Sequence, residues 1–253
     1  MSSFDAVAPS FDRHRALPEG AAKAICAAVL AALAPHPRLL DLGAGSGRIG
    51  WPLVIAAADY IGVDLSYGML RTFKDRAATA ALVQADGCEL PFRQGTFDAV
   101  LLVQIFGGLK RWRALIDETL RVLKPGGALL LGRILTPDDG IDAAMKRQLA
   151  AILSEQAAPP DQQNTREQAE RQLEAIASAA TEIEATHWPA TRRPRDFIER
   201  HAGGAQFSKW PPDIRARALR TLSDWAVGQF GGLDAGFTET HRFTLRIFKF
   251  AER

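Results

Sequence analysis

Several classes of protein are disfavoured by what this chain has little of. Its 253 residues contain two cysteines, Cys26 and Cys88, with neither the spacing of metal ligands nor a disulfide framework, which suits a reducing compartment, the cytoplasm. The net charge of +2, from 31 basic and 29 acidic residues, is too small to predict a nucleic-acid partner. The apolar stretch Ala24–Ala34 is too short to span a membrane and is interpreted as a flanking helix. The composition is that of an ordinary globular protein.

The glycine-rich run Leu39–Gly47 is the most informative segment of the chain. An apolar stretch that contains Asp41 runs directly into Gly43-Ala44-Gly45-Ser46-Gly47, a pattern typical of a buried parallel strand followed by a nucleotide-binding loop. Glycines in such a loop let the backbone come close to a ligand. The ligand stays open at this point, because Gly45–Gly50 also satisfies the dehydrogenase pattern G-x-G-x-x-G. In either class the acid at the next strand end, Asp64, suits a ribose diol.

Short apolar segments alternate with amphipathic ones through the first half of the chain. This alternation predicts a parallel sheet with helices on both faces. The segment Lys124–Gly127 is interpreted as a turn into the last of these strands. The predicted strands are 38–43, 59–65, 81–86, 97–105 and 127–135, and the predicted helices are 19–35, 47–57, 66–78 and 109–123.

The second half departs from this alternation after residue 135. Strand-like patterns return only at 181–192 and 237–249, and helices are predicted over 139–157, 163–180, 194–202 and 212–230. The intervening stretch is too long for an ordinary crossover and carries several aromatic residues. It predicts a helical cap that selects an apolar or aromatic substrate.

Further segments carry a family resemblance. After the glycine run come Asp64–Leu70, then Val83–Phe92 with Gly95–Val100, and finally Arg121–Gly127. In this order and spacing they resemble the class I S-adenosylmethionine-dependent methyltransferases, most of all the small-molecule branch that includes the ubiquinone and menaquinone C-methyltransferases. The resemblance is strong over residues 36–133 and looser elsewhere.

The resemblance implies a fold and a domain organisation. The fold is α/β, with a Rossmann-like, doubly wound, seven-stranded sheet that is mostly parallel with an antiparallel last strand. One domain covers 1–253, with a helical cap and an N-terminal lid. Its core is 19–136 and 181–192 with 237–250, its cap insertions lie within 139–180 and 193–235, and its lid is 1–18.

The resemblance also assigns the cofactor, S-adenosyl-L-methionine, to particular residues. Asp41 is expected to hold the ammonium, directly or through the loop, and backbone N–H groups of Gly43–Gly47 to meet the carboxylate. Asp64 is expected to accept from the ribose hydroxyls and Asp86 from the adenine amino group. The full expected set is Asp41, Gly43, Ala44, Gly45, Gly47, Asp64, Leu65, Met69, Asp86, Gly87, Cys88 and Gln104.

The acceptor side is less defined, and no general base is identified. His14, His187 and His241 are candidates for a base, although a structural role suits each of them better. The amide of Gln104 could orient a substrate but could not serve as a base. The residues expected around a small-molecule substrate are Phe11, His14, Arg15, Phe106, Trp188 and Phe207.

Two other functions are compatible with parts of the sequence. A nicotinamide-dependent oxidoreductase is favoured only by the G-x-G-x-x-G overlap, and both Asp41 directly before the turn and the segment Arg121–Gly127 argue against it. A non-catalytic S-adenosylmethionine-binding regulatory protein would keep the cofactor site without a base. The sequence predicts no metal, no nucleic-acid partner and no membrane span, and it leaves the acceptor atom and the oligomeric state open.

Overall fold

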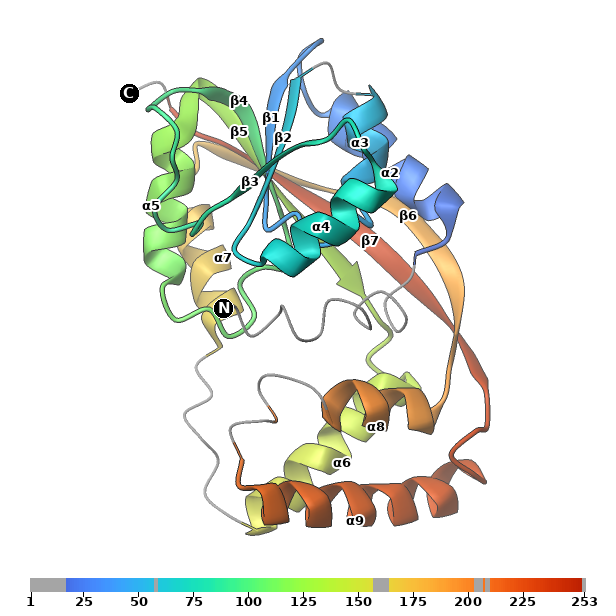
Figure 1. Cartoon of the computed structure of the whole chain (residues 1–253). Helices are drawn as coiled ribbons and strands as arrows, with labels where there is room; N and C mark the ends of the chain where they lie inside the picture. The colour runs from blue at the N-terminus through green and yellow to red at the C-terminus, as the bar shows by residue number, and fades with distance from the viewer. Residues whose placement is uncertain (1–16, 57–58, 157–163, 203–206, 208–209, 252–253) are drawn as a thin grey trace. The chain divides into compact units, whose positions relative to one another are not determined.

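The computed structural model describes residues 17–56, 59–156, 164–202, 207 and 210–251 (Figure 1). Phe11, His14 and Arg15, with most of the predicted lid, lie outside the described residues. The chain divides into two compact units. The first comprises Met1–Ile134, Asn164–Thr186 and Phe243–Arg253, and the second comprises Leu135–Gln163 and His187–Arg242. That the two work as a single domain stays a prediction.

A seven-stranded sheet organises the first unit, in the order β3-β2-β1-β4-β5-β7-β6 (Figure 1). Neighbours from β3 to β5 pair in parallel, whereas β7 runs antiparallel, and this confirms the predicted sheet. The strands β6 and β7 also extend into the second unit. The bounds are β1 Arg38–Leu42, β2 Asp59–Asp64, β3 Ala81–Gln84, β4 Phe97–Val103, β5 Leu123–Leu135, β6 Ala179–Arg192 and β7 Phe237–Lys249.

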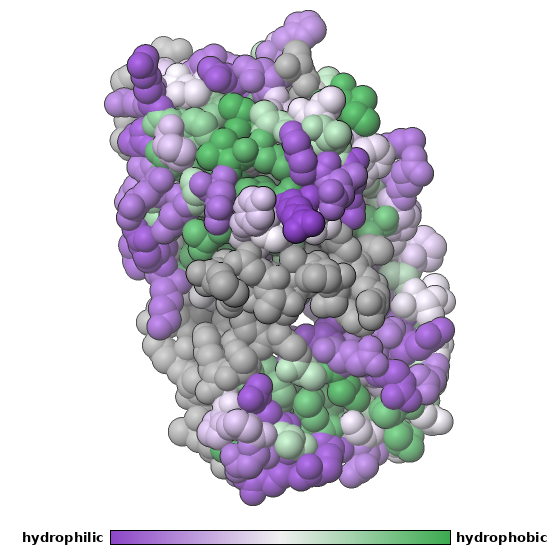
Figure 2. Space-filling view, in the orientation of Figure 1, coloured by the Kyte–Doolittle hydropathy of each residue, from purple (hydrophilic) through white to green (hydrophobic). Residues whose placement is uncertain are grey.

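Helices cover both faces of this sheet, as the strand–helix alternation predicted (Figure 1). On one face lie α2 (Glu19–Ala31), α3 (Trp51–Ala56) and α4 (Tyr67–Arg76), and on the other lie α5 (Trp112–Val122) and α7 (Thr165–Ile176). The sequence of α5 explains its place against the sheet. One stripe of its side chains is mostly apolar and buried, while its outward side is hydrophilic (Figure 2). The buried stripe is Trp112, Leu115, Ile116, Thr119 and Val122.

The central strands are buried because both of their faces are covered. Leu39 and Leu40 of β1 and Val100 of β4 are fully buried. The core on the α5 face continues through Leu173 of α7 to Phe248 of β7. Burying these side chains supplies the main driving force for folding of this unit, at about 25 cal/mol per Å² of apolar surface.

Two element boundaries and the placement of one helix differ from the sequence prediction in ways that bear on the site. The helix predicted from residue 47 begins at Trp51, because Gly47 has φ +74° and belongs to the loop. The predicted turn Lys124–Gly127 lies inside β5, where the register shifts from Phe97↔Leu123 to Ala99↔Ala128 and Gly126 has φ +73°. The helix α7, expected within a cap, packs against α5 in the first unit.

The second unit is a helical cluster with its own apolar core. It contains α6 (Ile141–Gln156), α8 (Pro194–Ala202) and α9 (Pro212–Phe230), and each of these helices contacts the other two. Of the aromatic residues predicted to meet a substrate, Phe207 is part of this core. The core includes Met145, Leu149, Phe197, Phe207, Trp210 and Leu222. The role of these helices as a cap stays a prediction.

A buried polar cluster also lies in the second unit. Asp142 of α6 pairs with Arg200 of α8 at 2.6 Å and lies 3.8 Å from Arg192 of β6. His241 of β7 contacts Glu239 at 2.8 Å, and its other ring nitrogen lies 3.5 Å from Arg192. Both ring nitrogens of the buried His241 therefore have polar partners within the chain, and this histidine has a structural role.

Candidate active site

Three loops meet at the carboxyl end of β1, the strand at the centre of the parallel part of the sheet. The loop after β2 reaches it through Asp64, whose carboxylate accepts the N–H of Gly45 at 2.9 Å. The loop after β4 packs Ile105 against Gly43, and the loop after β3 places Gly87 against Leu42. Ligands of open α/β sheets bind at this edge, so the predicted cofactor residues are assembled where a ligand would lie.

Glycine is required at three positions of the first loop for different structural reasons. Gly43, Gly45 and Gly47 have φ values of +82°, +56° and +74°, which other residues rarely adopt. A Cβ on Gly47 would lie 2.1 Å from the ring of Phe73, so Gly47 is required by packing. A Cβ on Gly45 would meet nothing closer than 3.9 Å. Gly45 is therefore the open point of the loop, where a ligand can approach the backbone.

Most backbone donors of this loop are already used within the chain. Gly43 and Ala44 both donate to the carbonyl of Val63, at 2.8 and 3.0 Å, and Gly47 donates to Ala44. These bonds rigidify the loop. They leave few of the N–H groups that were expected to meet a ligand carboxylate.

Asp41 lies beneath the glycine loop. It is 3% exposed and accepts a hydrogen bond from the Tyr60 hydroxyl at 2.7 Å. Burial raises the pKa of Asp41 to about 7; the Tyr60 bond opposes this rise, and the negative charge of Asp64 adds to it. Gly50 is a glycine because a Cβ there would lie 2.7 Å from the Asp41 carboxylate. Near pH 7 the buried Asp41 carboxyl is therefore ionised in only part of the molecules.

Asp64 connects the glycine loop to the start of α4. One carboxylate oxygen accepts the Gly45 N–H, and the other accepts the Ser66 N–H at 2.8 Å. Ser66 in turn caps α4 through the N–H of Met69. Leu65 is 54% exposed beside Asp64 and is available to a ligand, whereas Met69 is 3% exposed and belongs to the core.

The loop after β3 presents Asp86 in an ion pair that the sequence did not reveal. One Asp86 oxygen accepts the Cys88 N–H at 2.8 Å, and the other pairs with Arg111 at 2.9 Å. Gly87 is explained by packing, since a Cβ there would lie 2.7 Å from Leu115. Burial, with the Asp86 charge, raises the pKa of the Cys88 thiol to about 11, so this cysteine is not poised as a nucleophile.

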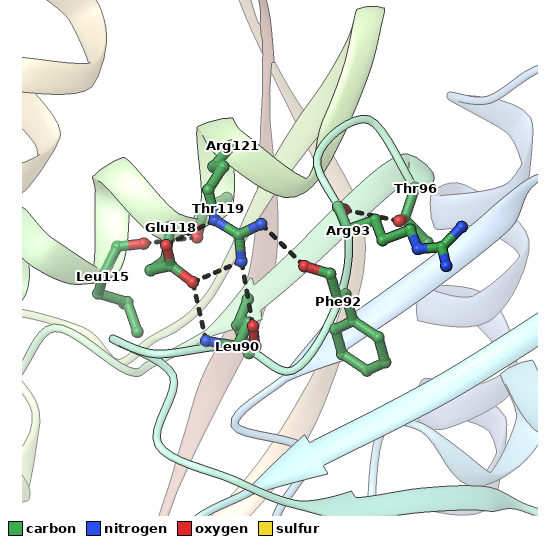
Figure 3. Close-up of polar contacts among 8 residues, drawn as sticks. All are labelled: Leu90, Phe92, Arg93, Thr96, Leu115, Glu118, Thr119 and Arg121. Atoms are coloured by element: carbon green, nitrogen blue, oxygen red, sulfur yellow. Dashed lines mark hydrogen bonds and ion pairs between the residues drawn. The ribbon is translucent and has the colours of Figure 1, made fainter.

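Arg121 of α5 holds the next part of the same loop (Figure 3). Its guanidinium donates to the carbonyls of Phe92 and Leu90, at 2.8 and 3.0 Å, and it pairs with Glu118 at 2.7 Å. Glu118 also accepts the Leu90 N–H at 2.8 Å. The pair lowers the pKa of Glu118. The sequence segment beginning at Arg121 therefore has a structural purpose, which is to fix the loop that follows Asp86.

Gln104 follows β4 and faces Arg48, which follows the glycine loop. The Gln104 side-chain oxygen accepts from Arg48 at 3.0 Å, and Gln104 has φ +52°. No motif pointed to Arg48, because its partner lies 56 residues away in the chain.

Known proteins similar to this chain point to the kind of site that this geometry describes. Residues 40–131 match the family model described as a methyltransferase domain. This stretch of the chain is therefore similar to a methyltransferase domain. The demethylmenaquinone methyltransferases of Corynebacterium urealyticum and Clavibacter sepedonicus are 40% identical over 105 residues and 36% identical over 140 residues. These matches cover 42% and 53% of this chain and 45% and 57% of those proteins, so the chain spans about half the length of these curated relatives.

The fold of the chain also has solved counterparts. The crystal structure of the YcgJ protein of Bacillus subtilis aligns with a TM-score of 0.59 and 20% identity. The alignment covers 91% of this chain and 99% of that one. At this identity the likeness establishes the fold alone.

Only some of the residues predicted to contact the acceptor lie near this edge. Phe106 follows Gln104, but its side chain is buried in the core, and its carbonyl accepts from Thr165 at 2.6 Å. Trp188 and Phe207 are buried within the second unit. In the described part of the chain no cluster of acidic, histidine or cysteine residues is arranged to hold a metal ion, and no helix has the length and apolar character to cross a membrane.

Proposed function

We propose that the chain binds S-adenosylmethionine and transfers its methyl group to a small-molecule acceptor. The observation that carries the proposal is the open backbone at Gly45, next to the carboxylate of Asp64 at the ligand-binding edge of the sheet. When bound, S-adenosylmethionine supplies a methyl group that is already activated on a sulfonium. The chain then has to hold the acceptor in line, within roughly 3–3.5 Å, and exclude water.

The side chains at this edge fit the polar parts of that cofactor. Asp64 would accept the ribose hydroxyls, and the exposed Leu65 beside it would cover the adenine. Asp86 would accept the adenine amino group, with Arg111 holding its second oxygen. In its ionised form Asp41 would attract the ammonium from behind the loop, because a buried charge is poorly screened.

The acceptor proposed is a small aromatic molecule of the kind that the relatives' names state. Demethylmenaquinone methyltransferases are 40% and 36% identical to this chain over 105 and 140 residues. The proposed compartment is the cytoplasm, where the free and buried Cys26 and Cys88 would stay reduced.

A thermal-shift comparison tests the cofactor. S-adenosylhomocysteine should raise the melting temperature, while NADH should not, because Asp41 and the arrangement around Gly45 match the methyl donor. Gly45→Val should remove the shift by blocking the open backbone. A shift with NADH alone would identify the oxidoreductase instead.

Methyl transfer separates an enzyme from a regulatory protein that only binds the cofactor. Purified protein is incubated with methyl-labelled S-adenosylmethionine and a bacterial metabolite extract. Label should move into small molecules, and Gly45→Val should abolish the transfer. Binding of the cofactor with no transferred label would support the regulatory protein.

A further inference from the structure

Arg48 and Gln104 form a bridge between the carboxyl ends of two neighbouring strands. Arg48 follows the glycine loop after β1, and Gln104 follows β4, which pairs with β1 in parallel through Leu42↔Leu102. The Arg48 guanidinium lies 3.0 Å from the Gln104 side-chain oxygen. The bridge therefore lies at the edge of the sheet where the proposed cofactor would bind.

The backbone holds Gln104 in an uncommon conformation. Its φ of +52° is left-handed, which costs free energy for a residue other than glycine. The neighbours impose it: the Gln104 N–H donates to the Gly132 carbonyl at 3.2 Å, and Ile105 packs against Gly43. The result is an exposed Gln104 side chain at this edge, although the residues before and after it are half-buried.

Arg48 decides which end of the Gln104 amide faces outward. A guanidinium has five donors and no acceptor, so only the amide oxygen of Gln104 can face it. The amide nitrogen, with its two N–H donors, must therefore point away from Arg48. The side chain presents donors beside a fixed positive charge.

We propose that the Gln104 amide binds an oxygen of the acceptor, and that Arg48 is the positioning residue that orients it. This inference rests on the proposed function. The class of acceptor that fits carries a carbonyl, enolate or phenolate oxygen next to the atom that receives the methyl group. Hydrogen-bond donors and a nearby guanidinium favour such an oxygen, especially when it is negatively charged, and disfavour an ammonium.

A purely structural bridge is the competing explanation, and Gln104→Glu separates the two. Glutamate keeps the length and an acceptor for Arg48, and the contact becomes an ion pair. It removes the two N–H donors. A structural bridge would be kept or strengthened by this change, whereas an oxygen-binding amide would be lost.

The experiment measures binding of two probes of similar size by calorimetry. One is 1,4-dihydroxynaphthalene, kept reduced under anaerobic conditions, and the other is 1-naphthylmethylamine, which has no oxygen. Each is titrated into the full chain with and without S-adenosylhomocysteine. Wild type should bind the dihydroxy probe about 10- to 100-fold more tightly than the amine, the range expected for hydrogen bonds that involve a charged group.

Three variants complete the test. Gln104→Glu and Arg48→Ala should each reduce the preference for the oxygenated probe to within about threefold, and Arg48→Lys should restore part of it. Arg93→Ala, an exposed arginine elsewhere in the same unit, is the matched control and should keep the full preference. Affinity for S-adenosylhomocysteine should stay within threefold in the control, Arg93→Ala.

Each result bears on one claim. If wild type binds both probes equally, or if Gln104→Glu keeps the preference, the amide does not select an oxygen and the inference is wrong. If Arg48→Ala weakens S-adenosylhomocysteine and leaves the probe preference intact, the bridge belongs to the cofactor site and the inference is equally wrong. A wild type that binds no S-adenosylhomocysteine but keeps the preference overturns the proposed function alone.

Discussion

Replacing Asp41 by asparagine should change how the stability of the first unit depends on pH. The folded pKa of Asp41 is about 7, because of burial, against 3.8 for an exposed carboxyl. Between these two pH values the folded state binds more protons than the unfolded state. The free energy of unfolding therefore falls as pH rises, and the part that depends on Asp41 is lost once the pH exceeds about 7. Asparagine has a similar shape and does not titrate, so Asp41→Asn should remove this loss.

The expected size follows from the two pKa values. Each pH unit between them changes the free energy of unfolding by about 1.4 kcal/mol. From pH 5 to pH 8 the wild type should therefore lose about 3 kcal/mol relative to Asp41→Asn, most of it below pH 7. The Tyr60 hydrogen bond opposes the rise in the pKa of Asp41, so Tyr60→Phe should move the transition to higher pH.

Native-state hydrogen exchange of the β1 amides is a suitable assay. It reports the opening free energy of this unit whether or not the two units unfold together. The quantity compared is the change between pH 5 and pH 8 in wild type minus the same change in Asp41→Asn, so that other titrating groups cancel. Equal changes in the two proteins would refute the reasoning, because Asp41 would then ionise as freely in the folded protein as in water.

Three further predictions concern the same edge of the sheet. Gly47→Ala should destabilise the fold by about 2–4 kcal/mol through the clash with Phe73. Gly45→Ala should destabilise it by about 1–2 kcal/mol and weaken binding of S-adenosylhomocysteine. Calorimetry and thermal melts that ranked the two variants the other way would contradict this. Asp64→Ala should weaken S-adenosylhomocysteine about 10- to 100-fold, and a loss below threefold by calorimetry would place the ribose elsewhere. Arg121→Ala leaves two loop carbonyls and Glu118 without their donor, so urea unfolding should show a loss of about 1–3 kcal/mol, whereas Arg93→Ala, whose side chain points away from Arg121 (Figure 3), should show none. Equal losses in these two arginine variants would mean that the Arg121 contacts contribute nothing.

Much of the fold could be predicted because local signals agree with the tertiary structure. The run at Leu39–Leu42 is continuously apolar apart from Asp41, and β1 proves to be buried on both faces. The stripe of α5 has helical spacing, and that face packs on the sheet. Boundaries were less predictable. The helix α3 begins only after Gly47, which has φ +74° and packs against Phe73, a residue from a later helix.

The candidate site was predictable in its residue types but not in their roles. The motifs mark acids at the ends of parallel strands, and a parallel sheet brings such ends together; that much the sequence determined by itself. Only the tertiary structure decided that Asp41 is buried on Tyr60 while Asp64 holds the loop at Gly45. It alone paired Arg48 with Gln104, across 56 residues, by placing β1 beside β4. Burial and pairing depend on strand order and packing, which bring distant parts of the chain into contact, and no local pattern encodes which distant partner a side chain will meet.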